Sequence, residues 1–261
     1  MNDKALKYKK LYYVLMIAVI LVSFIPLLVI GVHNRPSADD FNYAIDTFKV
    51  WNQTHSIFAT IEAAVQTSVR FLHTWQGLYA SAFLLALQPA IFGSKWYAMT
   101  GVIMMFLSAG SAVFFSCYVL KRLFKRTWLE GTTLGLVMTF LMIQYMPFCV
   151  EGIYWFNGAV NYVFFHAALL IFICLLIKLQ RKNSIRKEAM LLILCLFSVF
   201  VLEGGNHVTA LMTIVSIVVV SIARCRKDRR HTLENVFINS IVFLVLESKL
   251  TRNPGKNRCP W

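Results

Sequence analysis

The stretch LYYVLMIAVILVSFIPLLVIGV, residues 11–32, decides the fold class, because its 22 residues carry no charged side chain. A transmembrane helix needs about 20 predominantly apolar residues. Four lysines precede the stretch, and a secretory signal peptide has the same basic start and apolar core. The run is longer than a usual signal core, however, and no small-x-small cleavage site follows it. The sequence therefore favours an uncleaved membrane span.

The rest of the chain is also rich in apolar runs, and 58% of its 261 residues are hydrophobic. The further runs occupy residues 77–93, 97–120, 131–150, 159–177, 189–202, 208–223 and 233–246. This pattern predicts an all-α, polytopic membrane helix bundle of about seven spans, forming a single membrane domain over residues 1–247. Residues 248–261 have no pattern, and we expect them to be the end of a truncated or frame-shifted longer protein. An ordinary polar tail is the alternative.

The formal net charge of +14 does not indicate nucleic acid as a partner, because the basic residues are clustered. Of the 26 Lys and Arg residues, 18 fall in four short segments that each border an apolar run: residues 4–10, 121–126, 178–187 and 224–230. Cytoplasmic loops of membrane proteins carry this excess of positive charge. The sequence therefore predicts a multi-pass membrane protein with a cytoplasmic N-terminus and membrane lipids as partners.

One apolar run must fail to cross the membrane, because otherwise the cluster at residues 121–126 would lie outside. The weakest candidate is residues 77–93, which number only 17 and include Gln88 and Pro89. We expect this run to be a re-entrant or interfacial helix; the alternative is that one basic cluster violates the charge rule. Three polar segments are then external: residues 33–76, 151–161 and 203–207.

The first external segment contains a second kind of helix signal. Residues 56–75 place apolar or small side chains at helical spacing, which predicts an amphipathic helix along the outer membrane surface. Trp51 and Trp75 would lie at the level of the lipid headgroups. Arg70 and His73 share the upper side of this helix, where they would bind either a lipid phosphate or only the headgroup layer.

Asp39 and Asp40 are candidate catalytic residues just outside the first span. Adjacent carboxylates repel each other, so one of them would act as a base, or both would hold a divalent metal such as Mg or Mn. The spacing of Ser37 and Asp40 also fits a capping box that begins a helix. The two interpretations are compatible, with Asp39 free while Asp40 caps.

The other two external segments supply candidate substrate-binding residues. Residues 151–161 offer a carboxylate, amides and aromatic rings, which suit a sugar, although an aromatic belt at the membrane surface has the same composition. Residues 203–207 connect runs of only about 14 and 16 residues, which places them towards membrane depth, where ionisable groups usually face a cavity. A simple tight turn is the alternative. The candidates are Glu151, Trp155, Asn157, Glu203, Asn206 and His207.

Several short motifs resemble an uncharacterised bacterial family of polytopic membrane proteins related to GT-C glycosyltransferases and to O-antigen glucosyl transferases. The motifs are Ala38-Asp39-Asp40-Phe41, Trp75-Gln-Gly-Leu-Tyr79, the 151–161 segment with Trp155 and Asn157, and Glu203-Gly-Gly-Asn206. The resemblance covers residues 8–246. Two features depart from it. Gln76-Gly77 stands where a Gly-Arg pair is expected, and a later segment rich in Ala, Pro, Gly and Asn does not appear.

The resemblance implies a GT-C-like N-terminal part and an enzyme that takes a sugar from a polyprenyl-phosphate donor. The acceptor would be a cell-surface glycan or lipid on the outer face, and the base or metal ligand would be Asp39 or Asp40. A truncated copy would be inactive. Two alternatives remain open: a transporter or flippase of lipid-linked sugars, and a non-catalytic membrane assembly subunit.

Overall fold

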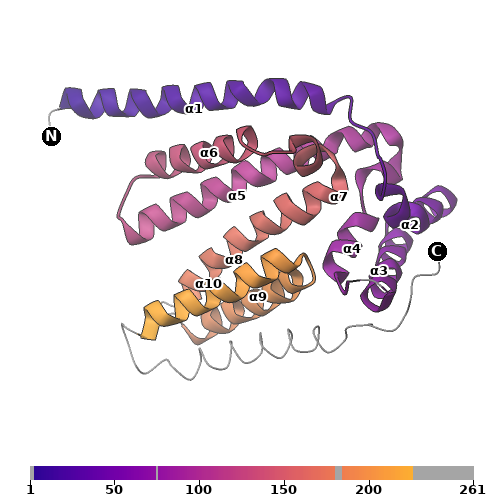
Figure 1. The fold of residues 1–261 in the computed structure, drawn as a ribbon. Helices are drawn as coiled ribbons and strands as arrows, with labels where there is room; N and C mark the ends of the chain where they lie inside the picture. Colours follow the sequence, from indigo (N-terminus) through magenta and orange to yellow (C-terminus); the bar gives the residue numbers. More distant parts are fainter. Residues whose placement is uncertain (1–2, 75, 180–183, 226–261) are drawn as a thin grey trace. The chain divides into compact units, whose positions relative to one another are not determined.

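A computed structural model of the chain describes residues 3–74, 76–179 and 184–225, and every regular element within these ranges is a helix (Figure 1). The predicted all-α class is therefore confirmed for this part of the chain. The α-helices are α1 (Asp3–Gly31), α2 (Asp40–Thr54), α3 (Ile57–Thr74), α4 (Tyr79–Ala86), α5 (Met99–Leu123), α6 (Trp128–Gln144), α7 (Phe156–Ala159), α8 (Phe165–Leu179), α9 (Ile185–Glu203) and α10 (His207–Cys225). Short 3₁₀ and π elements are η1 (Pro89–Phe92), η2 (Ser94–Ala98), η3 (Val150–Tyr154) and η4 (Val160–Phe164).

The helices form two compact units that alternate along the sequence. The first unit combines Met1–Ala44 with Gln88–Cys174, and the second combines Ile45–Leu87 with the described residues from Leu175 onward. Helices α2 and α8 each contribute to both units. The first unit therefore contains α1, α5 and α6, and the second contains α3, α4, α9 and α10.

Three continuous helical stretches are long and apolar enough to cross a membrane: Lys4–Gly31, Ser94–Leu123 and Phe156–Leu179. The sequence predicts about seven spans, whereas three helical stretches within the described residues have the length and composition of a span. The predicted span at residues 233–246, the tail at 248–261 and Trp75 lie outside those residues. The structure supports a membrane-type helical bundle at this coarser level.

The apolar run at residues 77–93 is divided into short pieces. Helix α4 has 8 residues and is followed by a break at Leu87 and Gln88, then by the 4-residue element η1. Eight helical residues extend only about 12 Å, whereas the hydrocarbon core of a bilayer is about 30 Å thick. Helix α4 is therefore too short to span the membrane.

In the first unit, α5 and α6 pack very closely along each other. Two glycines of α6 make this possible, because an added Cβ would lie 2.6 Å from Cys117 Cα at Gly131 and 2.4 Å from Val113 Cα at Gly135. Small residues four apart allow two helix backbones to approach in this way, as they do in membrane helix pairs. Ile20 of α1 joins the same core.

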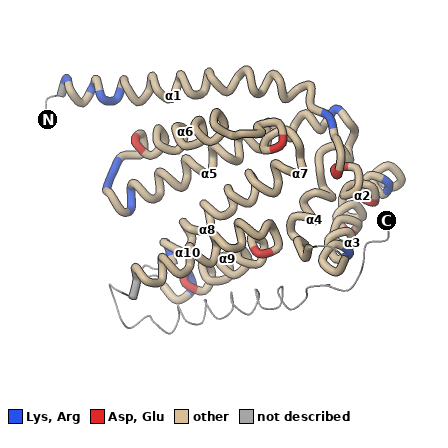
Figure 2. Tube along the Cα trace, viewed as in Figure 1, with Lys and Arg blue, Asp and Glu red and all other residues tan. Residues whose placement is uncertain are grey.

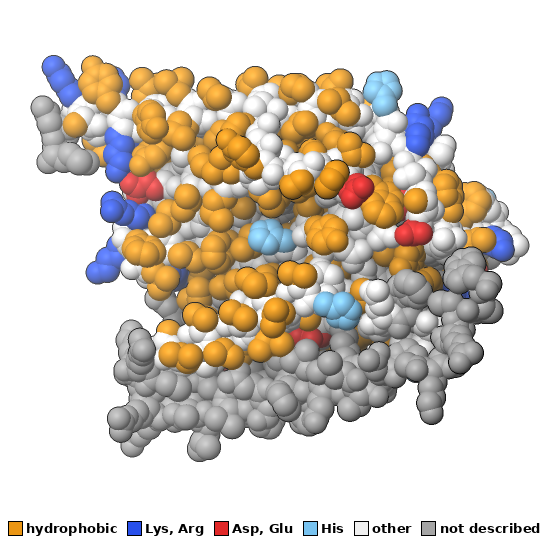
Figure 3. Space-filling model, in the orientation of Figure 1, with side chains coloured by type: hydrophobic (Ala, Val, Ile, Leu, Met, Phe, Trp, Pro, Cys, Tyr) orange, Lys and Arg blue, Asp and Glu red, His pale blue; other side chains and the backbone are white. Residues whose placement is uncertain are grey.

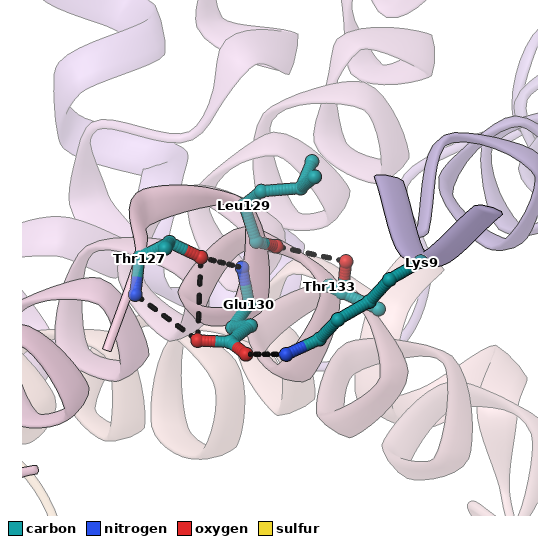
Figure 4. A network of polar contacts seen from close by, with 5 residues as sticks. All are labelled: Lys9, Thr127, Leu129, Glu130 and Thr133. Carbon is teal, nitrogen blue, oxygen red and sulfur yellow. Dashed lines mark hydrogen bonds and ion pairs between the residues drawn. The ribbon is translucent and has the colours of Figure 1, made fainter. Parts of the chain in front are cut away.

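The two ends of this helix group carry different residues. At one end, the start of α1 lies near the start of α6, because Lys9 Nζ contacts Glu130 Oε1 at 2.6 Å (Figure 4). At the other end, the ring of Tyr154 lies against both Gly31 and Gly101. Helices α1 and α6 therefore run in one direction and α5 runs in the other. Basic residues at the start of α1 and at the α5–α6 turn share one end, as the charge pattern requires (Figure 2).

The first helix also has the surface of a membrane span. Its large apolar side chains are widely exposed, including Val14, Val19, Val22 and Val29, whose exposed fractions range from 53% to 69%. Hydrophobic side chains cover α1 along its length in the space-filling view (Figure 3). Large contiguous apolar surfaces are rare on soluble monomers, so this surface suits lipid.

Candidate functional site

The candidate site begins where the chain leaves α1 and enters α2. Helix α1 ends at Gly31, and α2 begins at Asp40. The two adjacent aspartates have opposite environments, because Asp39 is exposed while Asp40 is 2% exposed. The structure therefore separates the two side chains that the sequence presents as a pair.

Asp40 is the centre of a buried hydrogen-bond network. Its Oδ2 accepts hydrogen bonds from the Tyr97 hydroxyl and from the backbone N–H of Ser37, the latter at 3.1 Å. Its main-chain oxygen accepts a hydrogen bond from the side-chain amide of Gln88. The Tyr97 hydroxyl in turn accepts from the backbone N–H of Phe156 at 2.8 Å. Asp40 thus ties together three segments that are distant in the sequence.

Asp40 makes one of the two hydrogen bonds of the predicted capping box. The carboxylate reaches back to the backbone N–H of Ser37, as the acid of a capping box does. The backbone N–H of Asp40 bonds to the main-chain oxygen of Ser37 at 3.1 Å. Asp40 therefore fixes the start of α2, and this position buries its carboxyl.

The segment at residues 151–161, which the sequence predicts to be external, contacts the loop that follows α1. Trp155 Nε1 donates to the main-chain oxygen of Ser37 at 3.2 Å, and Asn34 Nδ2 donates to the main-chain oxygen of Tyr154 at 2.5 Å. Asn157 is buried, with its Oδ1 accepting from Asn161 Nδ2 at 2.8 Å, whereas Glu151 is exposed. Two of the three predicted external segments are thus joined in the first unit.

The electrostatics of Asp40 are set mainly by burial, which raises the pKa of its carboxyl above the ordinary value. The hydrogen bonds from Tyr97 and Ser37 lower that pKa, and the nearby backbone N–H of Asn157 acts in the same direction. The charge of Asp39 raises it further. Within the part of the chain that the structure describes, no Lys, Arg or His side chain forms an ion pair with Asp40.

Within the described residues, the surroundings of Asp39 and Asp40 do not provide the ligands of a divalent metal site. Among the described residues, no group of three or more His, Cys, Asp or Glu side chains gathers to hold a metal ion. Asp40 is also turned into the network of Tyr97 and Ser37. The pair of Asp39 and Asp40 therefore does not by itself provide the several carboxylate ligands that Mg or Mn would take.

The remaining candidates belong to the second unit. Arg70 Nη1 forms an ion pair with Asp46 Oδ2 at 2.8 Å, and both side chains are partly exposed. His73 is exposed one turn further along α3. The Arg70 guanidinium thus already has an acidic partner, which a phosphate would have to displace.

The segment at residues 203–207 joins α9 to α10 and supports α4. Glu203 is fully buried, and Gly204 lies so close to Tyr79 that an added Cβ would be 2.4 Å from its ring. The Gly204 main-chain oxygen accepts from the backbone N–H groups of Ala80 and Ser81. Gly204 is therefore packed against α4.

The last two candidates lie where α10 begins. Asn206 Oδ1 accepts from the Thr209 backbone N–H at 2.8 Å, as a helix N-cap does. His207, the first residue of α10, is exposed. Of these two residues, His207 is the one with an exposed side chain.

Two residues of the Asp40 network were not among the sequence candidates. Tyr97 begins an apolar run, where an aromatic residue is commonly an interfacial anchor. Gln88 interrupts the apolar run at residues 77–93, and an amide in such a position is itself a signal of a buried polar partner.

Comparisons with protein-family models, with curated proteins and with solved structures gave no match.

Proposed function

We propose that this chain is a GT-C-like membrane glycosyltransferase that moves a sugar from a polyprenyl-phosphate donor to a glycan or lipid acceptor. The observation that carries the proposal is the contrast between the two aspartates. Asp40 is buried and held by Tyr97 and Ser37, whereas Asp39 is exposed beside it. A carboxylate fixed to a rigid helix start and open to a substrate is suited to general base catalysis.

In the proposed reaction, Asp39 takes the proton of the acceptor hydroxyl. The hydroxyl oxygen then bonds to the anomeric carbon of the donor sugar, while the bond between that carbon and the phosphate oxygen breaks. The electron pair of the broken bond leaves on the polyprenyl phosphate, and the configuration at the anomeric carbon inverts. Asp40 positions Asp39 through the start of α2, and no step is assigned to a metal.

Trp155 and Glu151 are the proposed sugar contacts in the same unit. Trp155 is partly exposed and is held at the first loop through its bond to Ser37, so its ring has a fixed place beside the aspartates. Indole faces stack well on the apolar faces of sugar rings. Glu151 is exposed on the element before it.

The second unit carries its own set of cationic and amide groups, which we propose as contacts for a lipid phosphate, separately from the groups of the first unit. The candidates remain Arg70, His73, Asn206 and His207, with Glu203 shaping the surrounding core. Arg70 would exchange Asp46 for a phosphate, which accepts hydrogen bonds from a guanidinium in the same bidentate manner as a carboxylate.

The proposal includes an orientation in the bacterial cytoplasmic membrane, with a cytoplasmic N-terminus, about seven spans and the aspartates outside. Its support is the first unit, where the basic residues of α1 and of the α5–α6 turn share the end opposite to Tyr154. Because positive residues remain on the cytoplasmic side, Asp39 would face outwards.

Replacing Asp39 tests the enzyme proposal directly. Asp39→Asn should lower sugar transfer by at least about 100-fold, the scale of a general base, while the protein still folds, because the side chain is exposed. The assay is transfer from a radiolabelled polyprenyl-phosphate sugar in membranes, with protein level measured in parallel. Glu62→Gln, which also neutralises an exposed acid of the first external segment, should leave transfer unchanged. Near-normal transfer by Asp39→Asn would remove this residue from the mechanism.

A transporter or flippase of lipid-linked sugars is the second candidate, and the break between α4 and η1 favours it. Interrupted helices form the substrate sites of many membrane transporters. The two candidates differ in what Asp39→Asn does. Loss of a base abolishes transfer chemically, whereas loss of one polar contact only weakens transport of the same lipid-linked sugar into vesicles.

A further inference from the structure

We propose that Asp40 and Gln88 form a buried binding site for one monovalent cation, with Na⁺ as its ligand. The site lies within the first unit, beside the Tyr97 hydroxyl. It is separate from the glycosyltransferase proposal, because it concerns how the first loop is held in place.

The Asp40 carboxyl lacks a partner of opposite charge. Burial raises its pKa above the ordinary value, whereas the two donors on Oδ2, the Tyr97 hydroxyl and the Ser37 backbone N–H, favour the ionised form that a bound cation would stabilise. An ionised carboxylate that is 2% exposed needs a positive partner, since an isolated buried charge is very costly. Among the described residues, no basic side chain provides one. A small cation would supply the missing charge.

Two buried oxygen atoms at this place, Asp40 Oδ1 and Gln88 Oε1, receive no hydrogen bond of normal geometry within the described residues. The backbone N–H of Asn157 is near enough to the Asp40 carboxyl to lower its pKa, but it does not form such a bond with Oδ1. The Gln88 amide nitrogen bonds to the main-chain oxygen of Asp40, so Oε1, which shares its carbon, lies beside the same residue. Both atoms can only accept hydrogen bonds or coordinate a cation when Asp40 is ionised. One bound cation would satisfy both.

Thr100 offers a further oxygen on the same helix face as Tyr97. It is fully buried, and its hydroxyl also has no partner within the described residues. Positions three apart on a helix are neighbours, which places Thr100 one turn beyond the residue that bonds Asp40. Carboxylate, amide and hydroxyl oxygens are ligands that hard cations prefer.

The charge count selects a monovalent ion. Asp40 is the single carboxylate among these buried groups, and Asp39 is exposed to solvent. A divalent cation is usually bound by several carboxylates, which the described residues do not gather. The gap between α4 and η1 places Gln88 in an extended conformation at this point, and unwound helix segments commonly coordinate Na⁺ in membrane proteins.

Thermal unfolding of the purified chain in lipid nanodiscs tests the site. NaCl is compared with N-methylglucamine chloride at equal ionic strength. The unfolding midpoint should rise by roughly 5 to 10 °C when Na⁺ reaches about 100 times its dissociation constant. Asp40→Asn should lose this response and be stable without Na⁺, because the side chain is then neutral and its amide N–H group can donate a hydrogen bond to Gln88 Oε1 in place of the coordinated cation. Radioactive Na⁺ should bind to the unmodified chain at about one ion per chain, by the same single-site scheme.

Glu130→Gln is the matched control, since it neutralises a carboxylate that already has Lys9 as its partner. This variant should keep the full response to Na⁺. Equal midpoints in Na⁺ and N-methylglucamine for the unmodified chain would overturn the proposal and assign the space to water. A midpoint that rises with acid but not with Na⁺ would overturn it in favour of a protonated Asp40. A response to Mg²⁺ alone would also overturn it. None of these readouts depends on sugar transfer.

Discussion

The segments Ser37-Ala-Asp-Asp40 and Thr127-Trp-Leu-Glu130 have the same pattern, a hydroxyl residue followed three positions later by an acid. Each stands at the start of a helix in the first unit, α2 for Asp40 and α6 for Glu130. Glu130 completes a capping box with Thr127, and its second oxygen is paired with Lys9 (Figure 4). Asp40 makes half of a box, and its second oxygen has no described partner.

The difference shows that a capping motif accounts for only one oxygen of its acid. The second oxygen of Glu130 is satisfied by a partly exposed lysine, and hydrogen bonds from Lys9 and Thr127 lower the pKa of Glu130 to about 2. The second oxygen of Asp40 is buried where no basic side chain reaches it among the described residues. Both carboxyl oxygens of Glu130 therefore have partners, whereas the second oxygen of Asp40 is available for the proposed cation.

The largest expected difference between the two caps comes from removing one hydroxyl. Tyr97→Phe leaves the Phe156 N–H without its acceptor and removes a donor from Asp40, so it should lower the free energy of unfolding by about 2 kcal/mol. Thr127→Ala at the exposed cap should cost about 1 kcal/mol. Both are measured by denaturant titration in detergent. Tyr162→Phe, at an exposed tyrosine, is the control, and an equal cost for Tyr97→Phe and the control would show that the Asp40 network is not stabilising.

A smaller effect is expected from pH. Because the pKa of Glu130 is lowered in the folded state, from 4.5 to about 2, its contribution to stability is present above about pH 4.5 and is lost as pH falls towards 2. Its size should stay under about 1 kcal/mol, since a solvent-screened pair contributes little. The raised pKa of Asp40 acts in the opposite direction, because the folded state then binds its proton more tightly than the unfolded chain.

Stability measured between pH 5 and pH 2 in Glu130→Gln tests this sign. The variant should lose less stability on acidification than the unmodified chain does, because it lacks the carboxylate that must be protonated. An identical acid response in both proteins would mean that the Lys9–Glu130 pair contributes nothing measurable.

The sequence predicts the all-α class correctly, because this class follows from local apolar patterns, whereas three of the seven expected spans are long and apolar enough within the described residues. Apolar runs and basic clusters determine where helices lie and which of their ends share a side. The Asp40 network was not predictable in the same way. Its key contact joins residues that are 57 positions apart, and neither Tyr97 nor Gln88 has a local motif that announces its partner.

The segment at residues 203–207 shows a second limit of the sequence. Two consecutive glycines allow a backbone to approach either a ligand or a neighbouring side chain. Only the structure shows that Gly204 packs against Tyr79. A pattern of small residues therefore indicates close approach without indicating what approaches.

In the proposed membrane protein, the two ends of the first unit face opposite sides of the membrane. Single cysteines at Ser37→Cys and Phe124→Cys, in a background without the six native cysteines, place one exposed label at each end and keep every basic residue. A membrane-impermeant thiol reagent should label the Ser37 variant in intact cells and the Phe124 variant only after permeabilisation. Labelling of Phe124→Cys in intact cells, with protection of Ser37→Cys, would contradict the account.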